Sequence, residues 1–178
     1  HEYGKIILPF IVFKRLDSII VDKKDKIIEL YKKWKNKSDD YNEIILNQLK
    51  INFFNTSSYD LKKLTQDPQN IKANFENYLK GFSVNVAEII ENFDIDKEIN
   101  KLDKNDRLFT LIEEFSEIDF SPQKVSNFEM GLIFEELLRR FSELSNETSG
   151  EHYTPRDVVR LLVSLVLTES FEKLKSTS

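Results

Sequence analysis

The chain has 178 residues, of which 40% are hydrophobic and 32% charged, and its formal net charge is −5 at pH 7. This length and composition indicate one globular domain, or one domain and the edge of another. No cysteine and only two histidines are present, which excludes a disulfide framework, thiolate chemistry and a zinc site of the Cys and His type. No apolar run approaches the roughly 20 residues that cross a membrane, and no signal-peptide pattern occurs, so we expect a cytoplasmic protein that does not associate with a membrane.

The first sixty residues are predicted to form amphipathic helices with short connections. Residues 3–20 carry one apolar face, and Pro9 is expected to start or kink this helix. The members of that face are Ile6, Phe10, Phe13 and Leu16. Further helices are predicted over residues 22–37 and 41–51, and the aperiodic residues 52–59 are predicted to be a loop.

Residues 22–37 contain seven lysines beside Tyr31 and Trp34. Such a cluster could contact nucleic-acid phosphate, because cationic side chains release counterions there. Three acidic residues, Asp22, Asp25 and Glu29, are interleaved with the lysines, and the whole chain is acidic. We therefore favour a solvated helix face.

The middle of the chain predicts four more helices. Asp67 and Pro68 form a cap and a first-position proline before a helix that ends near Gly81. Ser83 is expected to cap the next helix, and residues 94–102 and 103–118 to form two more. The predicted core residues of these helices are Ile71, Phe75, Tyr78, Leu79, Val86, Ile89, Ile90, Phe93, Leu108, Ile112 and Phe115. This pattern predicts a mainly α fold with a phenylalanine-rich core.

A helix is predicted over residues 126–145. Ser126 and Glu129 have the spacing of a capping box. One stripe at steps of three and four is expected to face the core, namely Met130, Phe134, Leu137, Phe141 and Leu144. On the other side Glu135 precedes Arg139, and Glu136 precedes Arg140, at the four-residue spacing of surface ion pairs.

Residues 145–150 form a polar turn, after which a second helix is predicted to begin. Thr154 has the character of an N-cap, Pro155 of a first helical residue and Asp157 of a first-turn acid. A helix start attracts anions, although a capped helix start without a ligand explains the same pattern. The helix beyond, residues 158–167, is apolar nearly all round, which predicts burial in a larger body.

Several of these segments resemble the modification (methyltransferase) subunit of type I restriction-modification systems. The resemblance rests on residues 102–108, 125–131 and 134–141, and above all on Gly-Glu-His-Tyr-Thr-Pro-Arg at 150–156. Residues 6–16 also resemble the opening helix of that family's N-terminal domain. The resemblance covers most of the chain and is densest from Leu102 to Val166.

The resemblance implies a fold and a cofactor site. Residues 1–145 would be a multi-helix N-terminal domain, and residues 146–178 the start, with the first helix, of an α/β S-adenosylmethionine-dependent methyltransferase domain. The residues implied to line the S-adenosylmethionine pocket are Glu151, His152, Tyr153, Thr154, Pro155 and Arg156. His152 occupies a position that often varies in the family, and its turn shows no partner at a spacing that would make it a base.

The resemblance also implies a function. The whole protein would methylate adenine N6 in DNA, on a flipped base, together with a specificity subunit, a restriction subunit and a second modification subunit. In the family a glycine-rich turn and an Asn-Pro-Pro-aromatic motif follow this region. This chain has no Gly-x-Gly, and its four prolines are isolated. We therefore expect a sequence cut at both ends, without catalytic or metal-binding residues, that does not methylate DNA by itself.

An alternative function from another class is a stand-alone helical protein-protein interaction domain. This alternative predicts that the helix from Val158 to Leu167 packs internally. The reading frame beyond Ser178 discriminates between the two hypotheses, because a glycine-rich turn and an Asn-Pro-Pro-aromatic motif there would decide for the methyltransferase.

Overall fold

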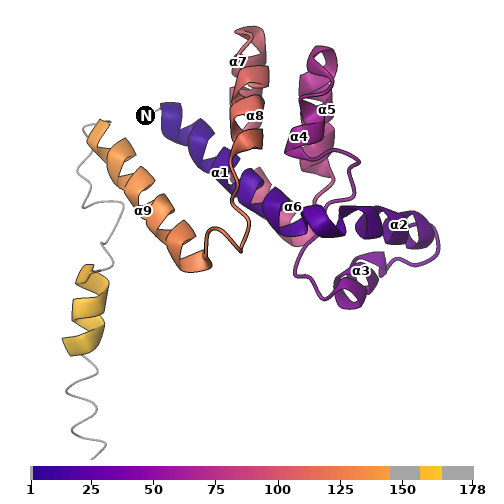
Figure 1. Cartoon of the computed structure of the whole chain (residues 1–178), viewed down its shortest axis with the longest axis horizontal. Helices are drawn as coiled ribbons and strands as arrows, with labels where there is room; N and C mark the ends of the chain where they lie inside the picture. Colours follow the sequence, from indigo (N-terminus) through magenta and orange to yellow (C-terminus); the bar gives the residue numbers. More distant parts are fainter. Residues whose placement is uncertain (1, 145–156, 166–178) are drawn as a thin grey trace, which may run out of the picture. The chain divides into compact units, whose positions relative to one another are not determined.

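The computed structural model describes residues 2–144 and 157–165, and within these ranges the chain is helical without a β-strand (Figure 1). Asn55 and Phe82 form an isolated antiparallel β-bridge. The prediction of a mainly α fold is confirmed. The α/β domain expected to begin near residue 146 falls largely outside the described residues and stays a prediction.

The chain divides into two compact units, with the boundary between Glu129 and Met130. The helices of the first unit are α1 (Glu2–Ile20), α2 (Lys24–Trp34), α3 (Tyr41–Leu49), α4 (Leu61–Leu64), α5 (Ile71–Lys80), α6 (Val84–Glu91), α7 (Asp96–Lys104) and α8 (Leu108–Glu117). Two 3-10 turns, η1 (Val21–Lys23) and η2 (Pro68–Asn70), precede α2 and α5. Helix α9 (Asn127–Leu144) crosses the boundary, and residues 157–165 are also helical.

Helix α8 lies at the centre of the first unit, where it packs against α1, α4, α5 and α7. In Figure 1 the pair α7 and α8 stands beside the pair α4 and α5, and α2 with α3 forms the other end of this unit. Pro9, predicted to start or kink the first helix, lies inside α1, so it does not start the helix, and the kink stays a prediction. Its missing N–H leaves one helical carbonyl without its usual donor, yet α1 continues through this position.

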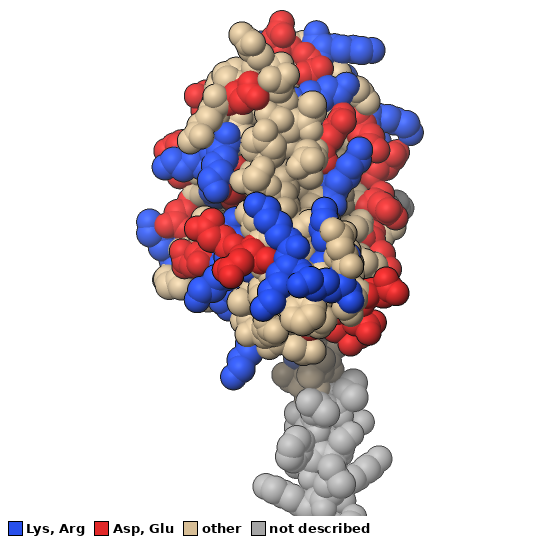
Figure 2. Space-filling view, turned by 90° about the vertical axis from the view of Figure 1, so that its right-hand side faces the viewer, with Lys and Arg blue, Asp and Glu red and all other residues tan. Residues whose placement is uncertain are grey.

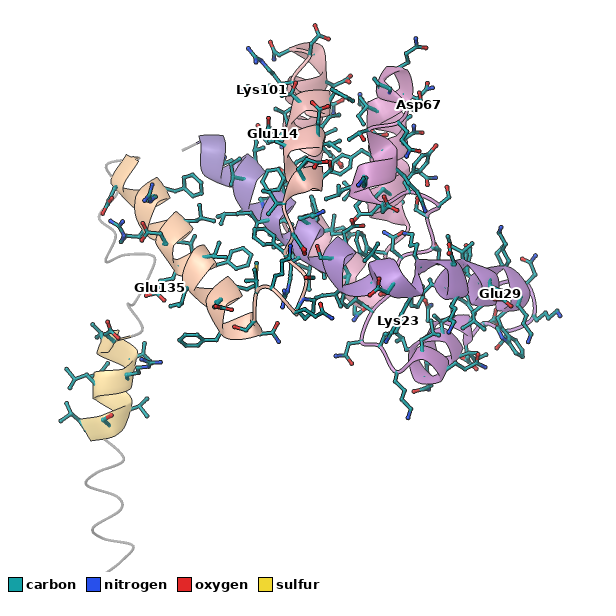
Figure 3. All side chains as sticks on the ribbon, viewed as in Figure 1. Lys23, Glu29, Asp67, Lys101, Glu114 and Glu135 are labelled. Carbon is teal, nitrogen blue, oxygen red and sulfur yellow. The ribbon has the colours of Figure 1, made fainter. Side chains whose placement is uncertain are left out.

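Aromatic rings fill the space between α1, α5 and α8 (Figure 3). Phe10 of α1 stacks on Phe75 of α5 at 5.3 Å between ring centroids and lies 5.4 Å from Phe115 of α8. Phe13 and Tyr78 extend the cluster, each with its centroid 6.1 Å from that of Phe75. The predicted inward position of these residues is confirmed, since all five are buried.

Three helix boundaries differ from the predicted ones because short turns interrupt the apolar pattern. Residues 21–23 form a 3-10 turn, so α2 begins at Lys24 and not at Asp22. Helix α7 extends to Lys104, and α8 begins only at Leu108. Asp106 between them has φ of 54°, a left-handed conformation that Asp tolerates better than most residues.

Residues 52–59 are irregular as predicted, and the irregular loop extends to residue 60, yet much of it is buried. Phe54, Asn55 and Ser57 are buried, and Phe54 donates its N–H to the Ser83 hydroxyl at 3.2 Å. Ser83 stands at the N-cap of α6 as predicted, but its side chain makes no cap hydrogen bond: the hydroxyl accepts the N–H of Phe54 and donates to Oδ1 of Asn85 at 2.8 Å. The loop is therefore part of the core.

The short helix α4 was not predicted, although the sequence contains its signal. Asp60 is its N-cap, and the carboxylate accepts the N–H of Lys63 at 2.7 Å. Leu61 and Leu64 follow at a spacing of three residues, and both are fully buried. An acid directly before two leucines at this spacing is the pattern that would have indicated the helix.

Gly81 directly follows α5, as predicted, but the reason for glycine here is steric. Its φ of −76° suits any residue. A Cβ at this position would lie 2.6 Å from Oδ1 of Asn55 and 2.7 Å from the backbone N of Ser57. Glycine is needed because the loop 52–60 passes directly over the end of α5.

Replacing Gly81 with alanine should lower the free energy of unfolding by about 2 kcal/mol, because the loop must move away from the added methyl group. Urea denaturation followed by circular dichroism measures this change. Gly131→Ala is the control: Gly131 lies inside α9, where alanine is expected to stabilise the helix by up to about 1 kcal/mol. If both variants were stabilised, the close approach at Gly81 would carry no cost.

Candidate functional site

The six residues predicted to line a cofactor pocket, Glu151, His152, Tyr153, Thr154, Pro155 and Arg156, lie outside the described residues. The structure describes the elements on both sides of them, α9 before and the helical residues 157–165 after. The described parts of the candidate site are therefore its flanking elements. Two features of these elements matter for the site: the start of α9 and the side chains that residues 157–165 expose.

The predicted capping box at the start of α9 is confirmed. The N–H of Ser126 donates to Oε2 of Glu129 at 2.8 Å, and the N–H of Glu129 donates to the Ser126 hydroxyl at 3.2 Å. These hydrogen bonds from Ser126 hold the pKa of Glu129 below its usual value. The reciprocal pair satisfies two N–H groups that the helix leaves open and fixes Asn127 as the first helical residue.

Two cations of α1 bind the connection that leads from α8 into α9. We call this arrangement the Arg15 clamp: Lys14 and Arg15 with the acceptors described next. The Arg15 guanidinium donates to the carbonyls of Phe120 at 2.6 Å and Val125 at 2.7 Å, and to Oδ1 of Asn127 at 2.7 Å.

Lys14 completes the clamp by donating to the carbonyl of Ser116 at 2.9 Å. Both cationic side chains are 8% exposed. Buried cations need several acceptors to offset their loss of hydration, and backbone carbonyls provide them here. The clamp was not predicted, because carbonyl acceptors leave no mark in the sequence.

Along α9 the polar side carries a chain of ion pairs. The predicted pair of Glu136 with Arg140 is confirmed at 2.8 Å. Arg139 contacts Glu136 at 2.7 Å and also pairs with Glu143. The two arginines lower the pKa of Glu136 to about 2. All these side chains are substantially exposed, so the pairs add little to stability.

The predicted apolar stripe of α9 is only partly buried. Met130 is buried, whereas Phe134, Leu137 and Phe141 are half-buried. Leu144, the last member of the stripe, has no described side chain. Of the described side chains of this stripe, Met130 is the one that lies in the core as predicted.

The helical residues 157–165 expose an apolar surface on every side. The exposed side chains, 44% to 59% accessible, are Val158, Val159, Leu161, Leu162, Val163 and Leu165. The internal packing that a stand-alone domain requires for this helix stays a prediction. Burial in a larger body stays a prediction for this helix, since so much apolar surface costs free energy in water.

A second candidate site is a buried polar cluster at the start of α2. Nζ of Lys24, 3% exposed, donates to Oδ1 of Asn55 at 3.1 Å and lies 5.8 Å from the centre of the Tyr78 ring. Burial lowers the pKa of Lys24 to about 8. Burial, and then the nearby Asp60, raises the pKa of Asp17.

This cluster joins four segments of the first unit. The Asp17 carboxylate of α1 accepts from the Tyr78 hydroxyl at 3.3 Å and from the N–H of Leu61 at 3.4 Å. Burial also raises the pKa of Tyr78 well above its usual value, so this hydroxyl remains a donor. Every contact connects one part of the core to another, and the cluster is buried, so we assign it to stability and not to chemistry.

The lysine-rich segment of α2 forms a third candidate surface. Figure 2 shows Lys and Arg side chains gathered over the end of the molecule formed by α2 and α3, with Asp and Glu side chains along both borders. Lys33 lies over the ring of Trp34 at 5.5 Å, and Lys35 over that of Tyr31 at 5.2 Å. Acidic side chains such as Glu29 project from the same helix (Figure 3). Lys33 and Lys35 thus contact aromatic rings of the same segment, as expected for a solvated face, whereas Lys24 is buried and does not belong to that face.

Within residues 2–144 and 157–165, no group of three His, Cys, Asp or Glu side chains could hold a metal ion. None of the described helices has the length and hydropathy needed to cross a membrane. The paired carboxylates Glu113 and Glu114 are exposed on α8, in keeping with surface positions and not with an acid-base pair.

Comparison with known proteins assigns the chain to a class and then to a family. Residues 1–115 match the family model described as HsdM N-terminal domain, and residues 126–176 match the one described as N-6 DNA Methylase. A helical domain followed by part of a methylase region is the arrangement of a DNA methylase subunit, and this is the class of the chain. Since the first match covers more than half of the chain, the chain belongs to the HsdM N-terminal domain family, and it contains the N-terminal region of a type I modification subunit.

A relative supports this assignment. The chain is 35% identical over 65 residues to the protein named Type I restriction enzyme MjaIX methylase subunit, from Methanocaldococcus jannaschii. The aligned part is 36% of this chain and 12% of that protein, so the chain matches only a small portion of its relative. No solved structure matches the chain. The resemblance to type I modification subunits is confirmed.

Proposed function

We propose that this chain is part of the subunit that methylates adenine N6 in host DNA within a type I restriction-modification complex, and thereby protects that DNA from restriction. The observation that carries the proposal is the order of the two family matches, HsdM N-terminal domain over residues 1–115 and N-6 DNA Methylase over residues 126–176. Adenine as the target base follows from the family resemblance. Residues 1–145 act as the helical domain, and residues 146–178 begin the catalytic domain.

The cofactor of the whole subunit is S-adenosylmethionine, and Glu151, His152, Tyr153, Thr154, Pro155 and Arg156 line its pocket near the methionine end. Two observations support this assignment. The six residues lie within the range that matches the methylase family, and they directly precede a helical segment. The N–H groups at a helix start and the Arg156 guanidinium suit the cofactor's carboxylate. The cofactor supplies the methyl group, and these residues bind and orient it.

The partners in this proposal are a specificity subunit, a restriction subunit and a second modification subunit, with DNA as substrate in the cytoplasm. The 178 residues alone do not methylate DNA, because the glycine-rich turn and the Asn-Pro-Pro-aromatic motif of the family are absent from them. The helical domain contributes contacts to these partners. Contact with DNA phosphate through the lysines of α2 is not required.

The experiment is a methyl-transfer assay on a protein extended beyond Ser178 and co-expressed with its specificity subunit. We expect labelled methyl groups on adenine, and we expect Thr154→Ala to weaken S-adenosylmethionine binding about tenfold by calorimetry. The same change should cost about 1 kcal/mol of stability through the lost cap. Phe128→Ala, on the exposed side of α9, is the control for cofactor affinity.

The outcomes separate the two parts of the proposal. A folded, complete complex without methyl transfer would refute the enzymatic function. Unchanged cofactor affinity in Thr154→Ala, with methyl transfer intact, would leave the turn as a helix cap and refute only the pocket assignment.

A further inference from the structure

A groove of about 670 Å³ opens between α5, α6 and the first turn of α7. We call it the acidic groove. Its lining residues are Glu76, Leu79, Lys80, Ala87, Ile90, Glu91, Asp94, Ile95, Asp96 and Asn100. All belong to the first unit, and none belongs to the segments assigned to the cofactor.

The base of the acidic groove is apolar. Leu79 of α5, Ile90 of α6 and Ile95 before α7 are buried members of the core that reach the groove with part of their side chains. Ala87 adds a small residue between them, which leaves room over α6. The apolar surface continues beyond the groove through Val84, which is 61% exposed and lies on the same face of α6 as Ala87.

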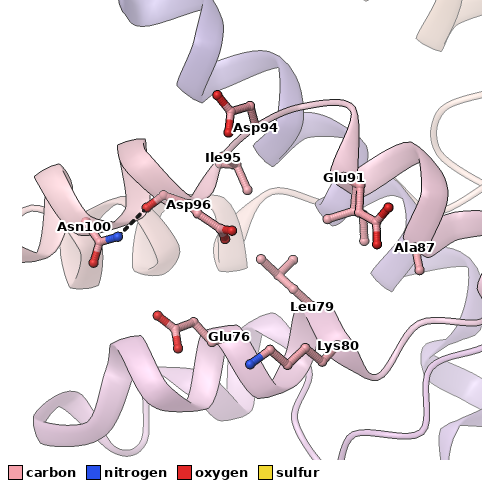
Figure 4. A pocket seen from close by; sticks show the side chains of 10 residues that line it. Glu76, Leu79, Lys80, Ala87, Glu91, Asp94, Ile95, Asp96 and Asn100 are labelled. Atoms are coloured by element: carbon pink, nitrogen blue, oxygen red, sulfur yellow. Dashed lines mark hydrogen bonds between the residues drawn. The ribbon is translucent and has the colours of Figure 1, made fainter.

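The walls of the groove carry an excess of negative charge. Figure 4 shows Glu76 and Lys80 on the α5 wall, Glu91 and Asp96 on the opposite wall, and Leu79 projecting between them. Three carboxylates face one ammonium group there, a net charge of −2. Asp94 at the outer edge pairs with Lys97 at 3.1 Å, and both side chains are largely exposed.

The backbone adds to the negative potential of the groove. The C-terminal turns of α5 and α6 both border the groove, and the partial negative charge of their carbonyls favours cations. The N-terminal turn of α7 has the opposite sign, but Asp96 lies within it. An apolar base between acidic walls selects a segment that presents apolar side chains flanked by lysine or arginine.

We propose that the acidic groove docks an amphipathic helix of a partner protein, with its apolar residues on Leu79, Ala87 and Ile90 and its lysines or arginines opposite Glu76, Glu91 and Asp96. A helix suits the groove because the walls are themselves helices, and a helix laid between them buries one apolar stripe. No residue of the groove belongs to the proposed cofactor site, so the proposal stands whether or not that site is correct.

The test uses the 178-residue chain and two fluorescent helical peptides of 18 residues. One peptide places leucines at i, i+3, i+4 and i+7 with lysines on both flanks, and the other replaces every lysine with glutamate. We expect saturable binding of the cationic peptide by fluorescence anisotropy and none of the acidic peptide.

Three variants locate the binding. The first is a triple variant, Glu76→Gln with Glu91→Gln and Asp96→Asn, which should weaken peptide binding at least about tenfold. The second, Ala87→Trp, should weaken it as much by filling the base of the groove without changing its charge. The matched control neutralises three exposed carboxylates of α8, Glu113, Glu114 and Glu117, and should leave the affinity within about twofold. Circular dichroism confirms that each variant is folded. An equal loss in the control, or full affinity in Ala87→Trp, would overturn the proposal, as would absence of saturable binding.

Discussion

Replacing Phe75 with alanine should lower the free energy of unfolding by about 4 kcal/mol, which is a large part of the stability of a domain of this size. Phe75 is fully buried and is the ring on which the aromatic cluster converges. Its centroid lies 5.3 Å from that of Phe10 and 6.1 Å from those of Phe13 and Tyr78. Alanine would remove these contacts and leave a cavity that stiff neighbouring rings cannot fill.

Urea denaturation monitored by far-ultraviolet circular dichroism measures this loss. Phe128→Ala is the matched control, because Phe128 is 53% exposed on α9 and its removal should cost less than about 1 kcal/mol. A cost below about 1.5 kcal/mol at Phe75 would mean that the helices repack around the cavity. The aromatic cluster would then not fix the positions of α1, α5 and α8.

Helical periodicity was enough to predict most of this fold. Phe10, Phe75 and Ile112 belong to apolar stripes at steps of three and four, and each lies buried as that spacing predicts. The prediction is wrong for Ile89, which is 50% exposed on α6. What periodicity could not predict is the role of residues without it. Asn55 and Ser57 belong to an aperiodic loop, yet both are buried, because the loop packs against Gly81 and its polar atoms form hydrogen bonds there.

The candidate site was predictable only through its resemblance to a family. Thr154 and Pro155 have the sequence pattern of a helix start, and a simple helix cap explains this pattern equally well. The family matches give the surrounding range a methylase assignment, while the residues themselves stay predictions. The acidic groove shows the opposite limit: Glu76 and Glu91 are ordinary surface carboxylates in the sequence, and only the packing of α5 against α6 makes them walls of one groove.

Replacing Arg15 with alanine should lower the free energy of unfolding by about 3 kcal/mol. The guanidinium donates to two carbonyls in the connection between α8 and α9 and to the side chain of Asn127 at the start of α9, at 2.6 to 2.7 Å. Alanine would leave the carbonyls of Phe120 and Val125 without these charge-assisted donors, and each such bond is worth about 1.5 to 3 kcal/mol. Arg15→Lys should recover only part of the loss, because an ammonium group lacks the planar fork that reaches several acceptors at once.

Urea denaturation measures the loss in the free energy of unfolding, and amide hydrogen exchange shows which residues are destabilised. We expect exchange to accelerate most at residues 119–127, since the clamp holds that connection. Arg140→Ala is the control, because Arg140 forms an exposed ion pair with Glu136 and should cost less than about 0.5 kcal/mol.

The location matters because Arg15 lies in the range that matches the HsdM N-terminal domain, while Asn127 lies in the range that matches the methylase family. The clamp thus joins α1 to the first turn of the helix that leads toward the proposed cofactor residues. If exchange rose evenly over the first unit, Arg15 would stabilise the core as a whole. A rise confined to residues 119–127 would show that one buried arginine sets how the helical domain continues into the methylase region.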